Sequence, residues 1–211
     1  MNHAEAKARM EEIQRIMERA TLWTLLPGTA AVIGGLLVLA GCAVSYGMIR
    51  SLDFAAMLDL PSGSQAAFCV MWFVIGVLGV VIETAFAARA AKRQGKSLTA
   101  RSARVAAFSM TPSVVVAMVL TLKFLVALEP RPDEVRYIVP VWMMLYGTGV
   151  YTAGLFSIRP PRILGITFIV TGIVALMAFP QYGVVSAALS FGLMHLVFGF
   201  YVIGKQRQGV E

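Results

Sequence analysis

Three ionisable side chains lie inside long apolar stretches of this 211-residue chain: Glu83, Lys123 and His195. A charged group is costly inside a bilayer, so such residues are the first candidates for proton or substrate sites. Glu83 lies six residues before Arg89, whereas Lys123 lies six residues before Glu129, near the opposite end of its own stretch. Because their depths differ by most of a bilayer, we do not expect these two residues to form an ion pair.

Glu83 admits two interpretations. By helical rise it lies within about 9 Å of the basic loop that follows, so an arginine or a lipid headgroup could satisfy its carboxylate at the interface. Alternatively, Glu83 binds a proton or a substrate, because its short side chain does not reach the interface easily. Lys123 has a long apolar stem, and we expect its ammonium group to extend outward toward Glu129 or Asp133.

His195 shares its helical face with three small residues, Ala188, Gly192 and Gly199, which is typical of a helix contact. This pattern favours a histidine that is hydrogen-bonded to a neighbouring helix. The alternative is a haem or metal ligand, which needs partner ligands. The only other histidine is His3, near the N-terminus, so we predict neither a metal site nor a cofactor.

Two threonines at helical spacing, Thr148 and Thr152, complete the candidate substrate or proton residues. Their hydroxyls either bond to their own backbone or line a polar crevice. We assign no catalytic residue, because the sequence Gly154-Leu-Phe-Ser157 lacks the Gly-x-Ser-Gly spacing of intramembrane serine proteases. Cys42 and Cys69 both lie in apolar stretches and indicate neither a metal cluster nor a disulfide framework.

The elements that must position these residues are apolar stretches of about 18 to 25 residues, long enough to cross a bilayer as helices. Hydrophobic residues make up 58% of the chain and charged residues only 14%, which excludes an ordinary soluble domain. The sequence therefore predicts an all-α integral membrane protein, a six-transmembrane-helix bundle. The predicted spans are 24–48, 65–88, 105–128, 137–157, 163–180 and 184–204. In the third span, Pro112 is expected to kink the helix.

An amphipathic helix precedes the bundle, because Met10, Ile13, Met17 and Ala20 recur at helical spacing among charged residues. It either packs on the bundle or binds a partner. The predicted organisation is a cytoplasmic amphipathic helix over 1–22, a six-span membrane domain over 23–205 and a cytoplasmic tail over 206–211.

Basic residues set the orientation. Fourteen lie on the side of the N-terminus and three on the other side, so the positive-inside rule predicts that both termini are cytoplasmic. We expect a multi-pass protein of a bacterial inner membrane. The net charge of +7 follows from this topology and does not indicate nucleic-acid binding. The second loop binds either anionic lipid or an acidic protein through six residues: Arg89, Lys92, Arg93, Lys96, Arg101 and Arg104.

Two segments, Ile13–Gly41 (IQRIMERATLWTLLPGTAAVIGGLLVLAG) and Met144–Leu176 (MLYGTGVYTAGLFSIRPPRILGITFIVTGIVAL), resemble segments of uncharacterised small multi-pass bacterial membrane proteins. The resemblance covers about a third of the chain and assigns no catalytic residue. Such proteins are often encoded beside winged-helix regulators, so the resemblance implies a membrane sensing or response role.

The sequence thus favours an interaction or sensing component of the inner membrane over an enzyme. Its expected partners are the lipid bilayer, a protein at the cytoplasmic face and further copies of the chain in a homo-oligomer. One alternative is a small secondary transporter with Glu83 in its path, for which a crevice reaching mid-membrane would be expected. Another is a membrane enzyme acting on lipid or quinone, which would require polar groups converging on a pocket.

Overall fold

The computed structural model describes residue 9 and residues 28–93, 101–126, 131–155 and 159–207. The described chain is helical and contains no strand. The predicted N-terminal amphipathic helix over 1–22 lies, apart from Arg9, outside the described residues. Most of the tail over 206–211 lies outside them too.

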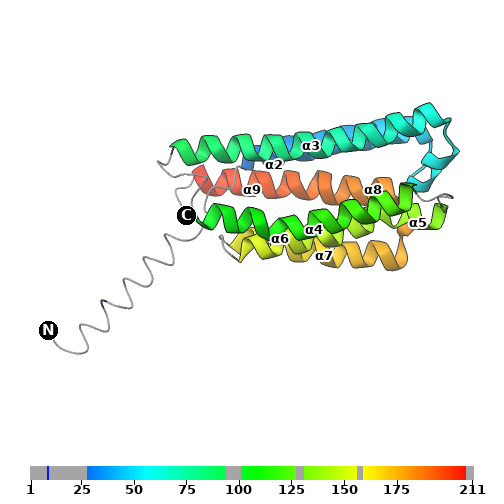
Figure 1. The fold of residues 1–211 in the computed structure, drawn as a ribbon. Coiled ribbons are helices and arrows are strands. Elements are labelled where there is room, and N and C mark those ends of the chain that lie inside the picture. The colour runs from blue at the N-terminus through cyan, green and yellow to red at the C-terminus, as the bar shows by residue number, and fades with distance from the viewer. Residues whose placement is uncertain (1–8, 10–27, 94–100, 127–130, 156–158, 208–211) are drawn as a thin grey trace.

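Long helices run side by side in a bundle, with short helical turns at one end (Figure 1). The prediction of an all-helical chain is confirmed. In chain order the elements are α2 (Gly28–Ile49), the 3₁₀ turn η1 (Phe54–Asp59), α3 (Ser62–Arg93), α4 (Arg101–Val126), α5 (Pro132–Arg136), α6 (Ile138–Gly154), α7 (Arg159–Ala178), the 3₁₀ turn η2 (Pro180–Tyr182), α8 (Gly183–Ala187), the π-helical segment η3 (Ala188–Met194) and α9 (His195–Arg207).

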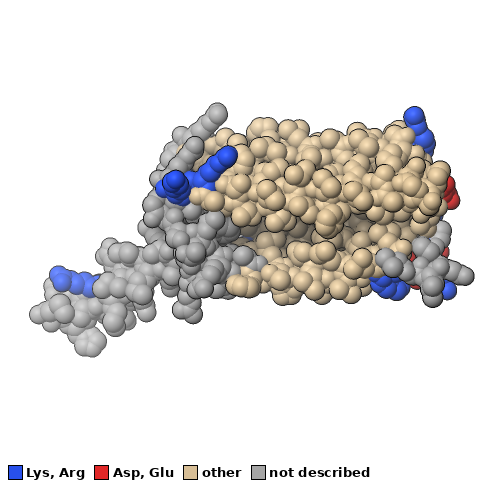
Figure 2. Space-filling model, turned by 45° about the horizontal axis from the view of Figure 1, so that its top comes forward, with Lys and Arg blue, Asp and Glu red and all other residues tan. Residues whose placement is uncertain are grey.

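Five stretches of the described chain are long and apolar enough to cross a membrane, which is compatible with a multi-pass membrane protein. They are Gly28–Ile49, Ser62–Ala90, Phe108–Leu125, Pro160–Ala178 and Pro180–Gln206. The fourth predicted span, 137–157, corresponds to α6, which has 17 residues and is not among the five. On the face shown in Figure 2, the charged residues lie toward the two ends and the long middle is free of them.

Local sequence explains where several helices begin, end or change. Arg50 adopts a left-handed backbone conformation with φ of 50°, which stops α2 at Ile49. At the other end of the bundle, Arg162 donates hydrogen bonds to the carbonyls of Gly154 (2.7 Å) and Leu155 (3.2 Å), which satisfies the last turn of α6. Helix α4 continues through Pro112, so the loss of one backbone donor does not end it.

The packed core lies toward the end of the bundle that carries η1 and α5. Phe68 of α3 and Phe168 of α7 are fully buried, and Phe54 of η1 contacts the Phe68 ring edge-on at 5.1 Å between centroids. Val135 of α5 is also fully buried. This end is therefore closed by side chains from the connections as well as from the long helices.

Two helix pairs approach closely through glycines: α6 with α7, and α2 with α9. A Cβ atom on Gly165 would lie 2.7 Å from the carbonyl oxygen of Gly147 and 2.6 Å from the backbone nitrogen of Tyr151. A Cβ atom on Gly28 would similarly lie 2.7 Å from the carbonyl oxygen of Gly199. Small residues allow backbones to meet in membrane bundles, and here they do so at specific positions.

The first prediction concerns this close approach. Gly165→Ala should lower the free energy of unfolding by about 1–3 kcal/mol, because the new methyl group meets backbone atoms that cannot move aside. The matched control is Gly34→Ala, since no atom lies within 4 Å of a Cβ there. This control should be neutral or stabilise the helix by up to about 1 kcal/mol. Unfolding in a denaturing-detergent titration measures both; equal effects would contradict the prediction.

Candidate functional site

His195, at the start of α9, makes a hydrogen bond across the bundle to α6. Its Nε2 lies 2.8 Å from the hydroxyl oxygen of Tyr146. The two rings belong to an aromatic cluster with Phe168 of α7 and Phe191 of η3, with centroid distances of 4.9 to 6.3 Å. The structure thus gives His195 the neighbouring-helix partner that its sequence pattern favours, and Tyr146 is the partner.

The second ring nitrogen of His195, Nδ1, is buried and makes no hydrogen bond within the described chain. The His195 ring lies near the backbone carbonyls of Ser190 and Phe191. These carbonyls belong to the π-helical segment η3, where the regular α-helical ladder is interrupted. Which of the Tyr146 hydroxyl and His195 Nε2 donates depends on the tautomer of the ring.

Thr148 and Thr152 bond to the backbone of their own helix. The Thr148 hydroxyl donates to the carbonyl of Met144 (2.9 Å), and the Thr152 hydroxyl to those of Thr148 and Gly149 (both 2.9 Å). Thr152 also lies 3.4 Å from the carbonyl of Ser109 on α4. Of the two interpretations of these threonines, backbone bonding is therefore the one visible in α6.

Glu83 has a different environment. Its side chain is exposed at the surface of the described chain. Within the described residues no hydrogen bond or ion pair engages Glu83. The side chains of Arg93, Arg101 and Arg104 lie outside these residues, so an arginine partner stays a prediction.

A stripe on α3 shows what surrounds Glu83. Trp72, Gly76, Gly79, Glu83 and Ala87 recur at three-to-four spacing and share one helical face. Trp72 packs against the core and Ala87 is buried, so this face points inward. Between them, however, a Cβ atom on Gly76 or Gly79 would meet no atom within 4 Å.

The inward face of α3 is therefore unfilled between Trp72 and Ala87. Helix α3 packs chiefly along α2. Only 6% of the residues in its most apolar stretch are buried inside the protein. Figure 2 shows a furrow along the molecule, between the side formed by α3 and the side formed by α4. We call this furrow the α3 crevice. Gly76, Gly79 and Glu83 lie on the inward-pointing face of α3 described above.

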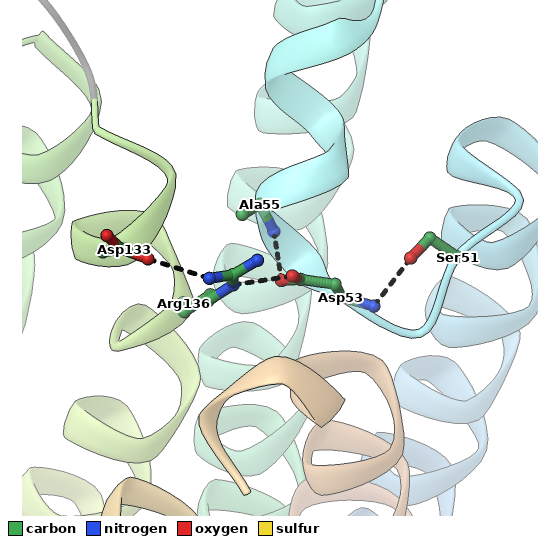
Figure 3. Close-up of polar contacts among 5 residues, drawn as sticks. All are labelled: Ser51, Asp53, Ala55, Asp133 and Arg136. Atoms are coloured by element: carbon green, nitrogen blue, oxygen red, sulfur yellow. Dashed lines mark hydrogen bonds and ion pairs between the residues drawn. The ribbon is translucent and has the colours of Figure 1, made fainter.

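A polar junction closes the end of the bundle away from the basic loop. Asp53 accepts a hydrogen bond from the Arg136 Nε at 2.6 Å, and its other oxygen accepts one from the backbone nitrogen of Ala55 at 3.0 Å (Figure 3). Arg136 also donates to Asp133 at 2.8 Å. Because Asp53 both caps η1 and pairs with α5, it joins the connection between α2 and α3 to the start of α6. This ion pair raises the pKa of Arg136 above its ordinary value.

Lys123 extends toward the same end, as expected, but its observed partner is Glu134. The ammonium nitrogen lies 2.8 Å from a Glu134 carboxylate oxygen, and this hydrogen bond lowers the pKa of Glu134. The expectation of Asp133 was wrong, because Asp133 lies on the face of the short helix α5 that meets Arg136. Glu129, the other expected partner, lies outside the described residues.

Two of the six basic loop residues have described side chains. Arg89 and Lys92 are exposed at the end of α3, and the Arg89 guanidinium lies over the Phe86 ring at 5.6 Å. Lys96 and the side chains of Arg93, Arg101 and Arg104 lie outside the described set, so the role of this loop stays a prediction.

Sequence reasoning missed the residues that hold helices together through single polar contacts. The Trp72 indole donates to the Ser45 hydroxyl (3.0 Å), joining α3 to α2, and the Trp142 indole donates to the Thr121 hydroxyl (2.7 Å), joining α6 to α4. Nothing in the spacing of these residues could have paired them. Asp53 did carry a local signal, because aspartate is a favoured cap before a helical turn.

Comparisons with protein-family models, with curated proteins and with solved structures find no match for this chain. The functional argument therefore depends on its own residues. Among the described residues, no group of three or more His, Cys, Asp or Glu is placed to hold a metal ion, and Cys42 and Cys69 are both free thiols.

The second prediction tests the polar junction. Asp53→Ala should lower the free energy of unfolding by about 1–2 kcal/mol, because it removes a helix cap and one member of an ion pair. Asp53→Asn should cost less, since an amide oxygen still caps η1. The matched control is Asp133→Asn, at a side chain that is 81% exposed. This control should change stability by less than about 0.5 kcal/mol. Thermal unfolding in detergent compares the three; a control as damaging as Asp53→Ala would contradict the junction's role.

Proposed function

We propose that this protein is a sensing component of a bacterial inner membrane that binds a small ligand or a proton at Glu83 in the α3 crevice. The observation that carries the proposal is the position of Glu83: its side chain is exposed, and it lies on the face of α3 that also carries Trp72 and the buried Ala87. A carboxylate in apolar surroundings needs a proton, a cation or water. The other interior polar groups discussed above, such as His195 and Ser45, already have protein partners.

A second candidate function, secondary transport, is favoured by the asymmetry of the bundle. The end carrying η1 and α5 is closed by buried side chains and by the Asp53–Arg136 pair. The crevice lies farther along α3, toward the basic loop. Access from one side with closure at the other is the arrangement that a carrier adopts in one of its two states.

The proposal includes six spans, with α6 as the fourth. Its 17 residues cover about 25 Å by helical rise, somewhat less than the roughly 30 Å of hydrocarbon, which local thinning or flanking residues can accommodate. Helix α6 packs between α4 and α7, both long enough to cross. The basic bias supports cytoplasmic termini, and the exposed Arg89 and Lys92 would then face cytoplasmic headgroups or a protein partner.

The third prediction tests this topology. Reporter fusions after residues 60, 97, 133, 158 and 205 should report outside, inside, outside, inside and inside, using phosphatase for the outside and a fluorescent protein for the inside. The decisive pair is 133 and 158, because these positions flank α6. If they report the same side, α6 does not cross and the six-span arrangement is wrong.

The fourth prediction tests the crevice. In a background with Cys42 and Cys69 replaced by Ala, Gly76→Cys and Gly79→Cys should react quickly with a water-soluble cationic thiosulfonate, because only a thiol in water forms the thiolate. The matched controls are Val74→Cys and Val81→Cys, exposed positions on other faces of α3. Their thiols should face lipid and react slowly. Equal rates at all four positions would remove the support for a wetted crevice.

Flux measurements separate the two candidate functions. Proteoliposomes containing a pH-sensitive dye should show proton flux that Glu83→Gln abolishes if the protein is a carrier. If the protein is a sensor, the crevice thiols should be reactive, and neither wild type nor Glu83→Gln should show proton flux. Glu83→Gln should retain the fold in both cases, because the side chains have nearly the same shape.

A further inference from the structure

The long helices of the described chain form two groups of three. Helices α2, α3 and α9 lie together on one side of the bundle, and α4, α6 and α7 lie together on the other (Figure 1). Helix α2 packs along both α3 and α9, and α6 packs along both α4 and α7. We call these the α2 group and the α6 group. Within the described residues, no long helix of one group packs extensively along a long helix of the other.

Close glycine contacts join helices inside each group. In the α2 group, a Cβ atom on Gly35 would lie 2.7 Å from the carbonyl oxygen of Gly192, in the π-helical segment η3 that leads into α9. In the α6 group, a Cβ atom on Gly147 would lie 2.7 Å from the carbonyl oxygen of Gly165. Among the described glycines, every such approach stays within one group. Because backbones this close cannot slide past each other without a clash, we expect each group to move as one body.

The two groups meet through side chains at two places. The first is the Asp53–Arg136 pair, at the end of the bundle where η1 meets α5, and α6 also contacts α8 there. The second is the hydrogen bond between Tyr146 and His195, in the middle of α6 and of the last span. From His195 to Arg207, α9 continues along α2 toward the basic loop. The described contacts between the groups are therefore concentrated at the η1–α5 end and in the middle.

The contact in the middle can separate more easily than the contacts inside each group. It consists of rings that pack side by side, with one hydrogen bond of 2.8 Å between Tyr146 and His195. The second ring nitrogen of His195 is buried and makes no hydrogen bond within the described chain. A buried polar atom without a partner is unfavourable, so the closed arrangement leaves this residue incompletely satisfied.

We propose that the α2 group and the α6 group rotate relative to each other about the η1–α5 end, with the Tyr146–His195 contact as the latch between them. Release of this latch separates the two groups on the side of the basic loop and leaves the glycine contacts inside each group unchanged. The inference goes beyond the proposed function, because it supplies the second conformation that a sensor or a carrier needs and does not require a ligand at Glu83.

The test measures distances between pairs of spin labels by double electron–electron resonance, on the full chain in phosphatidylcholine nanodiscs and in the cysteine-free background described above. The labels are attached at exposed positions in the half of the bundle nearer the basic loop. Phe200→Cys on α9 with Ile163→Cys on α7 spans the two groups. Phe200→Cys with Lys92→Cys lies within the α2 group, and Ile163→Cys with Phe108→Cys lies within the α6 group.

Tyr146→Phe removes the hydroxyl of the latch and keeps the ring. For the pair at 200 and 163, it should raise a minor population of longer distances about fivefold, the factor that corresponds to one net hydrogen bond. The matched control is Thr121→Val, which removes a hydroxyl that joins α4 to α6 inside one group. This control should leave the same distances unchanged. Both pairs within a group should keep their distances in every variant.

A further pair tests where the rotation is centred. Asp59→Cys in η1 and Asp133→Cys in α5 are exposed and span the two groups at the end away from the basic loop. Their distance should stay constant in Tyr146→Phe, because this end is the centre of rotation. If Tyr146→Phe does not fold, His195→Leu removes the same hydrogen bond from the other side. Fluorescence-detected size-exclusion chromatography checks the fold of each variant.

Three outcomes would overturn the proposal. Unchanged distances for the pair at 200 and 163 in both latch variants would show that the contact is not a latch. Longer distances within a group would show that the bundle loosens as a whole. An equal increase at the η1–α5 end would show separation without a centre of rotation there. None of these measurements uses Glu83, so their failure is distinguishable from failure of the proposed function, which the thiol and flux measurements test.

Discussion

The Asp53–Arg136 contact is the interaction on which the arrangement of the bundle depends. Helix α3 packs chiefly along α2, so its relation to α4 and α6 is set largely at the end where η1 meets α5. There, one carboxylate caps η1 and binds a guanidinium on α5, while Phe54 and Val135 fill the space beneath. Because both charged groups are partly exposed, the ion pair contributes modestly to stability; its main effect is to fix which connections meet.

Between Trp72 and Ala87, α3 borders open space at Gly76 and Gly79. Helices α6 and α7 meet with glycine backbones in contact, as do α2 and α9. In α3 the glycines serve no such approach, since no atom lies near Gly76 or Gly79. Glycines therefore allow close contact between α6 and α7 and between α2 and α9, whereas those at Gly76 and Gly79 of α3 face open space. The position of the facing helix distinguishes these cases.

The sequence predicted the helices well because each is a long apolar run, and it found Glu83 and His195 because ionisable residues are rare in such runs. It could not identify Tyr146 as the partner of His195, since that pair is 49 residues apart and depends on how α6 packs against α9. The π-helical turn in η3 was also hidden, because Ala188–Met194 has the composition of an ordinary apolar helix. The error on Lys123 has a related origin: Asp133 and Glu134 are adjacent, and the orientation of α5 decides which one it meets.

His195 and Glu83 are both ionisable residues inside predicted spans, which makes each a candidate functional residue. Their being rare there does not tell a structural role from a binding role. His195 is held on one side by Tyr146 and across its ring by Phe168 and Phe191. Such a residue can orient helices, but moving it would break several contacts at once. Glu83 has no comparable restraint in the described chain and is accessible. The proposed site is placed on α3 rather than at the histidine because the Glu83 side chain is exposed, whereas His195 is enclosed by its contacts.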